Sequence, residues 1–144
     1  MKEINLLKNE DVPKEISYEN FALVIQGHSA FQLLWAGIHF NVFDILLENP
    51  GVLTETQLIN KIKLKTKTGK ILLEGLLTLR LILRDKETGK LFLSDMAKRH
   101  LVESSKENIV KVLGWQAHIV YPAGTDFIPS LEQDTNVGLA HFPG

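Results

Sequence analysis

Residues 21–40, FALVIQGHSAFQLLWAGIHF, place apolar side chains on nearly every side of any helix that they form. No Lys or Arg occurs between Lys14 and Lys61, so no basic stripe marks a side that faces water. A helix that is hydrophobic all round is normally buried all round. We therefore expect one side of this helix to pack on its own domain and the other side to be covered by a second chain, with a central helix of a monomeric bundle as the alternative.

A membrane-spanning helix is another reading of the same segment. Polar side chains interrupt it, so no uninterrupted apolar run approaches the ~18 residues of a typical span. No cationic flank anchors either end. We expect no membrane insertion, because of the polar positions Gln26, His28, Ser29, Gln32, His39, Asn41 and Asp44.

The remaining composition is that of one domain in a reducing compartment. The chain has 144 residues and no cysteine, which excludes disulfides and thiolate metal sites. Acidic residues stand where a secretory signal needs an apolar run, so we expect a cytoplasmic protein. The net charge is -1, yet residues 61–111 hold thirteen Lys or Arg against six Asp or Glu.

Helix and turn signals divide the chain into short segments. A helix is expected from about residue 18 to residue 40, with Asn41 as a turn, and a second helix in VFDILLE before Asn49-Pro50-Gly51. Thr54 with Gln57 forms a capping box for the next helix, in which Leu58, Ile59 and Ile62 face inward. In the helix of TKTGKILLEGLLTLRL, the helical spacing predicts four inward side chains: Ile71, Leu72, Leu76 and Leu79.

The second half of the chain starts with a hairpin. Two apolar runs flank DKETG, residues 85–89, which predicts a β-hairpin. Ser94 is a candidate cap for DMAKRHL, and Ser104 with Glu107 predicts a capping box that opens a further helix. Helix, helix and hairpin in this order are typical of a winged helix, which we place at residues 52–93. The predicted fold class is mainly α, with this winged-helix core, one small β-hairpin and flanking helices.

The residues also carry a family resemblance. AGIHFNVFDILLENPGVLTETQLINKI, LLEGLLTLRLILRD and KLFLSDMAKRHLV resemble the N-terminal domain of S-adenosylmethionine-dependent O-methyltransferases of the plant caffeate and acetylserotonin type, a domain shared by bacterial polyketide-tailoring relatives. GWQAHIVYPAGTDFIPSLEQDTNVGLAHFPG resembles their linker. Arg80 departs from the family, which usually has a small residue there.

The resemblance implies a domain plan and a function. Residues 1–17 would be a flexible tail, residues 18–104 an intertwined dimerisation domain around the winged-helix core, and residues 105–144 a helical linker toward a catalytic domain. The expected function is dimerisation and substrate-pocket formation in an enzyme that methylates a small phenolic or polyketide hydroxyl. The catalytic domain, in cis or as a separate subunit, would bind S-adenosylmethionine.

Catalysis by these residues alone is not expected. No glycine-rich loop follows a strand, so we assign no catalytic, cofactor-binding or metal-binding residue. His28, Gln32 and His39 share one helix face, but their spacing suits hydrogen bonding better than metal binding. The residues expected at the dimer interface are Phe21, Leu23, Phe31, Leu34, Trp35 and Phe40.

The candidate substrate contacts lie in a base-free, aromatic segment. Residues 112–144 contain no Lys or Arg, and aromatic walls with few polar groups are typical of small-molecule pockets. Trp115, His118 and Tyr121 are the candidates to contact an aromatic substrate, against ordinary core packing as the alternative. Gln26, His28 or Ser29 are weaker candidates, reaching the partner's pocket.

A DNA-binding regulator is the rival function. KIKLKTKTGK holds five Lys in ten residues just before the would-be recognition helix, and such clusters contact phosphates. That helix, however, offers few side chains able to read bases, and the hairpin tip DKETG has a net charge of -1, where a DNA-reading wing needs positive charge. The methyltransferase interpretation also accounts for the aromatic C-terminal segment, which DNA binding does not.

Overall fold

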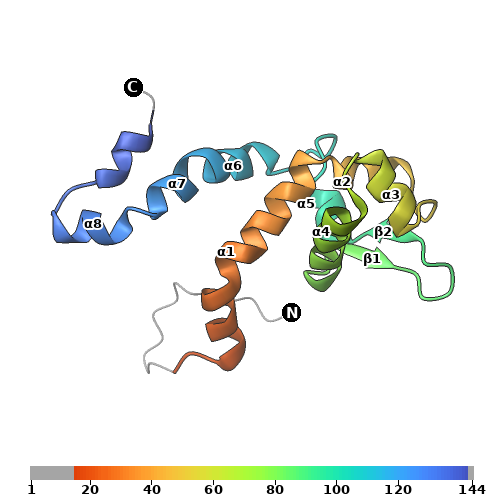
Figure 1. The fold of residues 1–144 in the computed structure, drawn as a ribbon, viewed down its shortest axis with the longest axis horizontal. Coiled ribbons are helices and arrows are strands. Elements are labelled where there is room, and N and C mark those ends of the chain that lie inside the picture. The colour runs from red at the N-terminus through yellow and green to blue at the C-terminus, as the bar shows by residue number, and fades with distance from the viewer. Residues whose placement is uncertain (1–14, 143–144) are drawn as a thin grey trace.

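The computed structural model describes residues 15–142, and these form a mainly helical chain with one two-stranded sheet. The mainly α fold class with one small β-hairpin, expected from the sequence, is confirmed. Most of the predicted tail, residues 1–14, lies outside the described residues. Figure 1 shows a small head from which two limbs extend.

The first limb is the long helix α1, Tyr18–His39. It begins at Ser17, whose hydroxyl accepts a hydrogen bond from the Asn20 N–H at 3.1 Å, and it ends where Asn41 adopts the left-handed conformation with φ 56°. Asparagine tolerates that conformation better than most residues. The helix and its turn therefore form where the sequence predicts them.

The head consists of residues 42–102. It contains α2 (Val42–Glu48), α3 (Glu55–Lys61), α4 (Thr66–Thr78), β1 (Ile82–Arg84), β2 (Leu91–Leu93) and α5 (Asp95–His100). The predicted capping box at α3 is present, since the Thr54 hydroxyl accepts from the Gln57 N–H and the Gln57 side chain accepts from the Thr54 N–H. Thus the helix–helix–hairpin order expected for residues 52–93 is present.

The hairpin is antiparallel, with Leu83 opposite Phe92. Its turn is organised by Asp85, whose carboxylate accepts hydrogen bonds from the Glu87 and Thr88 N–H groups at 3.0 and 2.7 Å. These hydrogen bonds, led by those from Thr88, hold the pKa of Asp85 below its usual value. Gly89 closes the turn with φ +68°, a conformation that favours glycine.

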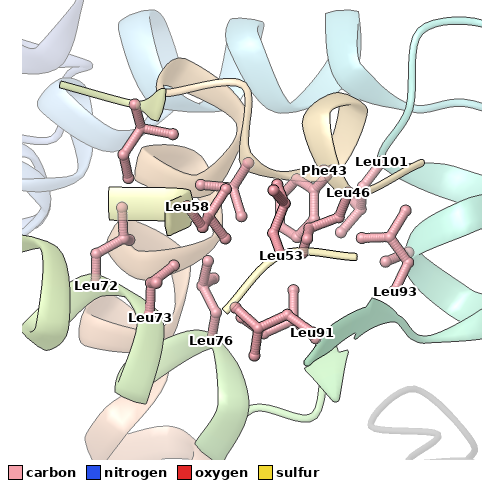
Figure 2. Close-up of a cluster of buried hydrophobic side chains, with 14 of the residues drawn as sticks. Phe43, Leu46, Leu53, Leu58, Leu72, Leu73, Leu76, Leu91, Leu93 and Leu101 are labelled. Carbon is pink, nitrogen blue, oxygen red and sulfur yellow. The ribbon is translucent and has the colours of Figure 1, made fainter. Parts of the chain in front are cut away.

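A single apolar core fills the head (Figure 2). Phe43 and Leu46 of α2, Leu73 of α4, and Leu91 of β2 are all at most 1% exposed, and the core side chains come from every element of the head. α1 packs on α4 at Gly75, where an added Cβ would lie 2.5 Å from the Leu33 side chain and would displace it. The core thereby anchors the second half of α1.

α4 differs from the sequence expectation in one respect. Its buried residues are Gly69, Leu72, Leu73 and Leu76, whereas Ile71 is 61% exposed and Leu79 is half-buried. The inward side is therefore rotated relative to the predicted one. Helical periodicity alone could not tell which of several adjacent apolar residues of α4 faces the core. The contacts of α4 with α3 and α1 decide this.

The predicted capping box at Ser104 and Glu107 is wrong. Residues 103–109 form turns, in which the Ser105 hydroxyl donates to the Arg99 carbonyl at 2.6 Å and the Ile109 N–H donates to the His100 carbonyl at 2.9 Å. These contacts tie the segment to the end of α5, and the next helix begins only at Val110. Tertiary hydrogen bonds override the local capping signal.

The second limb starts with α6 (Val110–Trp115), which continues through the π-helical turn η1 (Gln116–Val120) into α7 (Tyr121–Gly124). α8 (Phe127–Glu132) and the 3-10 turn η2 (Val137–His141) follow. Leu113 inserts into the head core, so α6 is anchored there, while α8 and η2 lie far from the head in Figure 1.

Candidate functional site

The two limbs meet midway along α1, where they enclose an open groove of about 380 Å³. One wall comes from α1 and the other from η1 and the start of α7. The lining is mostly apolar, with few polar groups, as in small-molecule sites. The lining residues are Gly27, His28, Phe31, Gln116, Val120 and Tyr121.

Aromatic contacts fix this junction. The rings of Phe31 and Tyr121 stack with centroids 5.4 Å apart and an interplanar angle of 16°, and the Tyr121 hydroxyl donates to the His28 carbonyl at 3.1 Å. Deeper along α1, the Trp35 and His118 rings meet edge to face at 5.4 Å. The groove is therefore lined by two stacked aromatic rings, one from each side, which are held together by a hydrogen bond.

The π-helical turn sets the direction of the groove wall. Pro122 has no N–H, so the His118 carbonyl four residues earlier lacks its α-helical donor. The turn before the proline is widened, which changes which side chains of residues 116–121 share a face. Such turns occur frequently at functional sites.

The three predicted substrate residues lie in different surroundings. Tyr121 lines the groove, whereas His118 is exposed and contacts Trp35 beside it. Trp115, the last residue of α6, is 55% exposed and does not line the groove. The structure thus brings Tyr121 to the groove with His28, one of the weaker candidates on α1, while Gln26 and Ser29 are exposed outside it.

Sequence reasoning missed the remaining lining residues. Gly27 has open space where a side chain would be, which leaves the groove accessible from α1. Gln116 and Val120 are brought in by the π-helical turn, and Phe31 had been assigned to a dimer interface. Pro122 was the available signal, because a proline inside a helical pattern disturbs the preceding turn.

The six predicted interface residues form two groups. Phe31, Leu34, Trp35 and Phe40 are half-buried and pack against the head core. Phe21 and Leu23 lie on the first half of α1 and are 50% and 49% exposed. A charge at Leu34 or Trp35 is therefore expected to disturb the head itself as well as any interface.

Large apolar side chains are exposed on the parts of the two limbs that extend away from the head. We call these parts the first arm, residues 18–29 of the first limb, and the second arm, residues 115–142 of the second limb. Proteins seldom expose such surfaces unless a partner covers them. The exposed apolar residues are Tyr18, Phe21, Leu23, Val24 and Ile25 on the first arm, and Trp115, Val120, Phe127, Ile128, Leu131 and Leu139 on the second.

α1 is also long and apolar enough to cross a membrane by length and composition. It has 22 residues, of which few are fully buried. Helices that pack in a protein core or at a protein interface can be equally long and apolar. Gln26, His28 and Gln32 interrupt the exposed part, and the other half of the helix is packed on the head.

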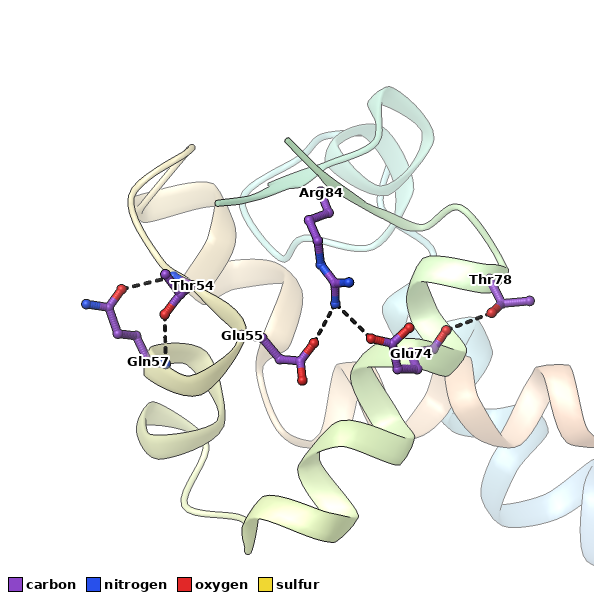
Figure 3. Close-up of polar contacts among 6 residues, drawn as sticks. All are labelled: Thr54, Glu55, Gln57, Glu74, Thr78 and Arg84. Carbon is purple, nitrogen blue, oxygen red and sulfur yellow. Dashed lines mark hydrogen bonds and ion pairs between the residues drawn. The ribbon is translucent and has the colours of Figure 1, made fainter. Parts of the chain in front are cut away.

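The face of α4 carries an ion-pair network (Figure 3). Arg84 of β1 donates to Glu74 at 2.8 Å and also to Glu55 of α3. The hydrogen bond from Arg84 lowers the pKa of Glu74, and the same bond raises the pKa of Arg84. Two carboxylates therefore stand on the surface that a winged helix would turn toward DNA.

The comparisons with known proteins concern methyltransferases. No family model matches the chain. The chain is 29% identical over 129 residues to the L-tyrosine C(3)-methyltransferase of Streptomyces lavendulae, a match that covers 90% of this chain and 34% of that protein.

Solved structures agree with this relationship. The S-adenosylmethionine-dependent methyltransferase SibL matches with a TM-score of 0.76 and 26% identity over 89% of this chain and 37% of that chain. An O-methyltransferase family 2 protein from Planctomyces limnophilus, in complex with apigenin, matches with a TM-score of 0.59 and 25% identity over 88% and 38%. Human N-acetylserotonin methyltransferase shares the fold, with a TM-score of 0.73 and 19% identity over 83% and 35%.

The matches cover most of this chain but only part of each of these relatives. The chain spans about a third of the length of these relatives. The resemblance seen in the sequence is confirmed: the chain is similar to the N-terminal part of S-adenosylmethionine-dependent methyltransferases, O-methyltransferases among them.

Proposed function

We propose that the chain is the dimerisation and substrate-pocket domain of an S-adenosylmethionine-dependent O-methyltransferase that acts on a small aromatic hydroxyl. The single observation that carries the proposal is the groove between α1 and η1, with its stacked Phe31 and Tyr121. A planar phenolic ring fits an aromatic wall of this kind. The similarity to methyltransferases supplies the reaction class.

The chemistry requires a second domain. A methyl group passes from the sulfonium of S-adenosylmethionine to the acceptor oxygen, and the hydroxyl proton leaves to a base. We assign the cofactor and the base to a catalytic domain outside these residues, in cis or on another subunit. Residues of the groove would bind and orient the aromatic acceptor. The tyrosine relative is named for methylation at carbon, so product analysis must distinguish O-methyl from C-methyl products.

The domain plan remains part of this proposal. Residues 18–104 would form the dimerisation domain, with a winged-helix core at residues 52–93, and residues 105–144 would lead to the catalytic domain. The exposed apolar side chains of the two arms support a homodimer, because a partner copy would cover them. We also propose that the protein is cytoplasmic.

Ligand binding by the chain itself tests the pocket. Apigenin, which is bound in the structure of one relative, is a suitable probe, with quenching of Trp fluorescence as the readout. We expect weak binding, because an open groove covers only part of a ligand, and a loss of several-fold or more for Phe31→Ala. Phe92→Ala, which changes a phenylalanine 38% exposed on the hairpin, is the matched control.

One result would contradict the pocket, and a second measurement tests Trp115 separately. Equal affinity of Phe31→Ala and Phe92→Ala for apigenin would mean that the groove is not the binding site. In the complete enzyme, Trp115→Ala should raise the acceptor KM and leave the cofactor KM unchanged if Trp115 contacts the acceptor. An unchanged acceptor KM would remove Trp115 from the site.

The DNA-binding alternative has a specific obstacle. Glu74 of α4 and Glu55 of the neighbouring α3, both held by Arg84, place two carboxylates beside the helix that phosphates would approach. A salt-dependent shift of duplex DNA by the chain would nevertheless favour it over the methyltransferase proposal.

A further inference from the structure

A cluster of lysines on the head has no part in the proposed pocket or in the arms. Five exposed lysines follow one another here: one ends α3, two lie in the turn between α3 and α4, and two lie on the first half of α4. Within residues 15–142, the ion pairs use other basic residues, on β1, α5 and η2. We call this cluster the lysine corner: Lys61, Lys63, Lys65, Lys67 and Lys70.

The start of α4 is electrostatically unfavourable for the isolated fold. α1, α3 and α5 each begin with a Ser or Thr whose hydroxyl accepts a backbone N–H, and each has an acid in its first turn. α4 instead begins at Lys65, which forms no side-chain cap, and its first turn has no acid. Lysines at this end oppose the helix dipole.

The turn before α4 adds a second local cost. Lys63 adopts φ 59°, a left-handed conformation that is uncommon for a residue with a Cβ. Glycine or asparagine would be more favourable there. Sequences that break local rules without a gain in packing often do so at functional sites. The lysine corner is therefore better explained by a partner than by folding.

An exposed apolar residue lies among these charges. Ile71 is 61% exposed and stands one helical turn after Lys67, beside Lys70. An apolar centre with a polar rim is the usual anatomy of a protein–protein contact, and the lysines would be its rim. Phosphate-rich partners fit less well, because Glu74 follows on the same face and is fixed by Arg84 (Figure 3).

We propose that the lysine corner and Ile71 form a docking surface for an acidic protein, which would place carboxylates against the lysines and an apolar side chain against Ile71. The arms contribute no Lys or Arg, so association through the arms would not use this surface. The proposal does not depend on methyl transfer or on the apigenin groove.

The test uses the full chain and a defined probe. The probe is a fluorescein-labelled helical peptide of Glu, Ala and Leu with three leucines on one face; a scrambled peptide of the same composition is its control. We expect fluorescence anisotropy to show binding to the wild type that weakens as salt rises. We also expect the amphipathic peptide to bind at least threefold more tightly than the scrambled one.

Three variants locate the binding. Lys63→Glu/Lys67→Glu should weaken binding at least tenfold, and an acid in the first turn of α4 should not harm the helix. Lys86→Glu/Lys106→Glu makes the same charge change at two exposed lysines elsewhere and should weaken binding less than threefold. Ile71→Ser should abolish the preference for the amphipathic peptide. Circular dichroism confirms that each variant is folded.

The following outcomes would overturn the proposal. Equal losses in the two double variants would mean that only net charge matters. No preference for the amphipathic peptide would remove Ile71 from the surface. Displacement of the peptide by duplex DNA or by vesicles containing phosphatidylserine at lower concentration than by unlabelled peptide would assign the corner to phosphate groups instead.

Discussion

The head and the two arms differ in how far their large apolar side chains are buried. In the head, large residues such as Phe43, Leu58 and Leu73 are at most 1% exposed within one core. On the arms, residues of similar size such as Val24, Ile128 and Leu131 are 65–67% exposed. The same apolar chemistry therefore completes a core in one region and leaves an open surface in the other.

This difference separates folding from assembly. The head has a buried core of its own, and it anchors the arms through Leu33, Trp35 and Leu113. Fully covering one large apolar side chain contributes roughly 1.5–3 kcal/mol, so the exposed arms represent a strong drive toward a partner. The head supports the groove, and the arms would supply the association that we propose.

A matched pair of leucines gives the largest expected contrast. Leu73 is 0% exposed in the head, and Leu73→Ala is expected to lower the free energy of unfolding by about 2–5 kcal/mol, because it leaves a cavity. Leu131→Ala, on the second arm at 66% exposure, should change the unfolding of the head by less than ~0.5 kcal/mol. Chemical denaturation at low protein concentration measures both. Similar losses would contradict the distinction between head and arms.

A second pair tests association. Val24→Asp on the first arm should raise the dimer dissociation constant at least tenfold, since a lone charge in an apolar interface is costly. Ile71→Asp, on the head at a similar 61% exposure, should leave it unchanged. Light scattering across a dilution series is the measurement. A monomeric wild type of about 16 kDa at micromolar concentration would remove the dimer from the proposal.

The junction of the arms is expected to give a smaller effect. Tyr121→Phe keeps the stacking on Phe31 but loses the hydrogen bond to the His28 carbonyl, so it should cost about 0.5–1.5 kcal/mol. Hydrogen exchange of the amides around residues 116–121 should rise, while exchange in the head stays constant. An unchanged exchange pattern would show that the hydroxyl does not hold the groove wall.

The smallest predicted effect is a pH dependence within the head. The pKa of Glu74 is lowered by Arg84, so this contribution to stability is present above the unfolded-state pKa and is lost as pH falls through the folded-state pKa. The pair is exposed, so only a few tenths of a kcal/mol are expected. The stability advantage of wild type over Arg84→Met should therefore shrink between pH 7 and pH 3. An advantage that grows on acidification would contradict the ion pair.

Several local structures could be predicted from the sequence because neighbouring residues determine them. Thr54 with Gln57 caps α3, Asn41 turns the chain after α1, and Asp85 with Gly89 closes the hairpin, all through contacts within a few residues. The capping box at Ser104 failed for the opposite reason. Contacts with α5, which no local pattern contains, fixed that segment instead.

The candidate site needed the tertiary structure. Tyr121 was chosen from the sequence for its aromatic ring, but its neighbour Phe31 lies ninety residues earlier on α1. Only the fold brings these two rings together, and only the widened turn at residues 116–120 directs Gln116 and Val120 to the same groove. Sequence reasoning gave Trp115 the same standing as Tyr121, yet the structure leaves Trp115 outside the groove.

The sequence by itself determined the mainly helical fold, its capped helices and its hairpin, and also the apolar character of both arms, because these follow from local hydrogen bonding and from the periodicity of side chains. The tertiary structure alone decided which apolar residues are covered. Leu34 and Trp35 pack on the head, whereas Phe21 and Leu23 of the same helix stay exposed. The physical reason is that a side chain is buried only where another part of the fold packs against it. The second half of α1 packs against the head, whereas the first half does not.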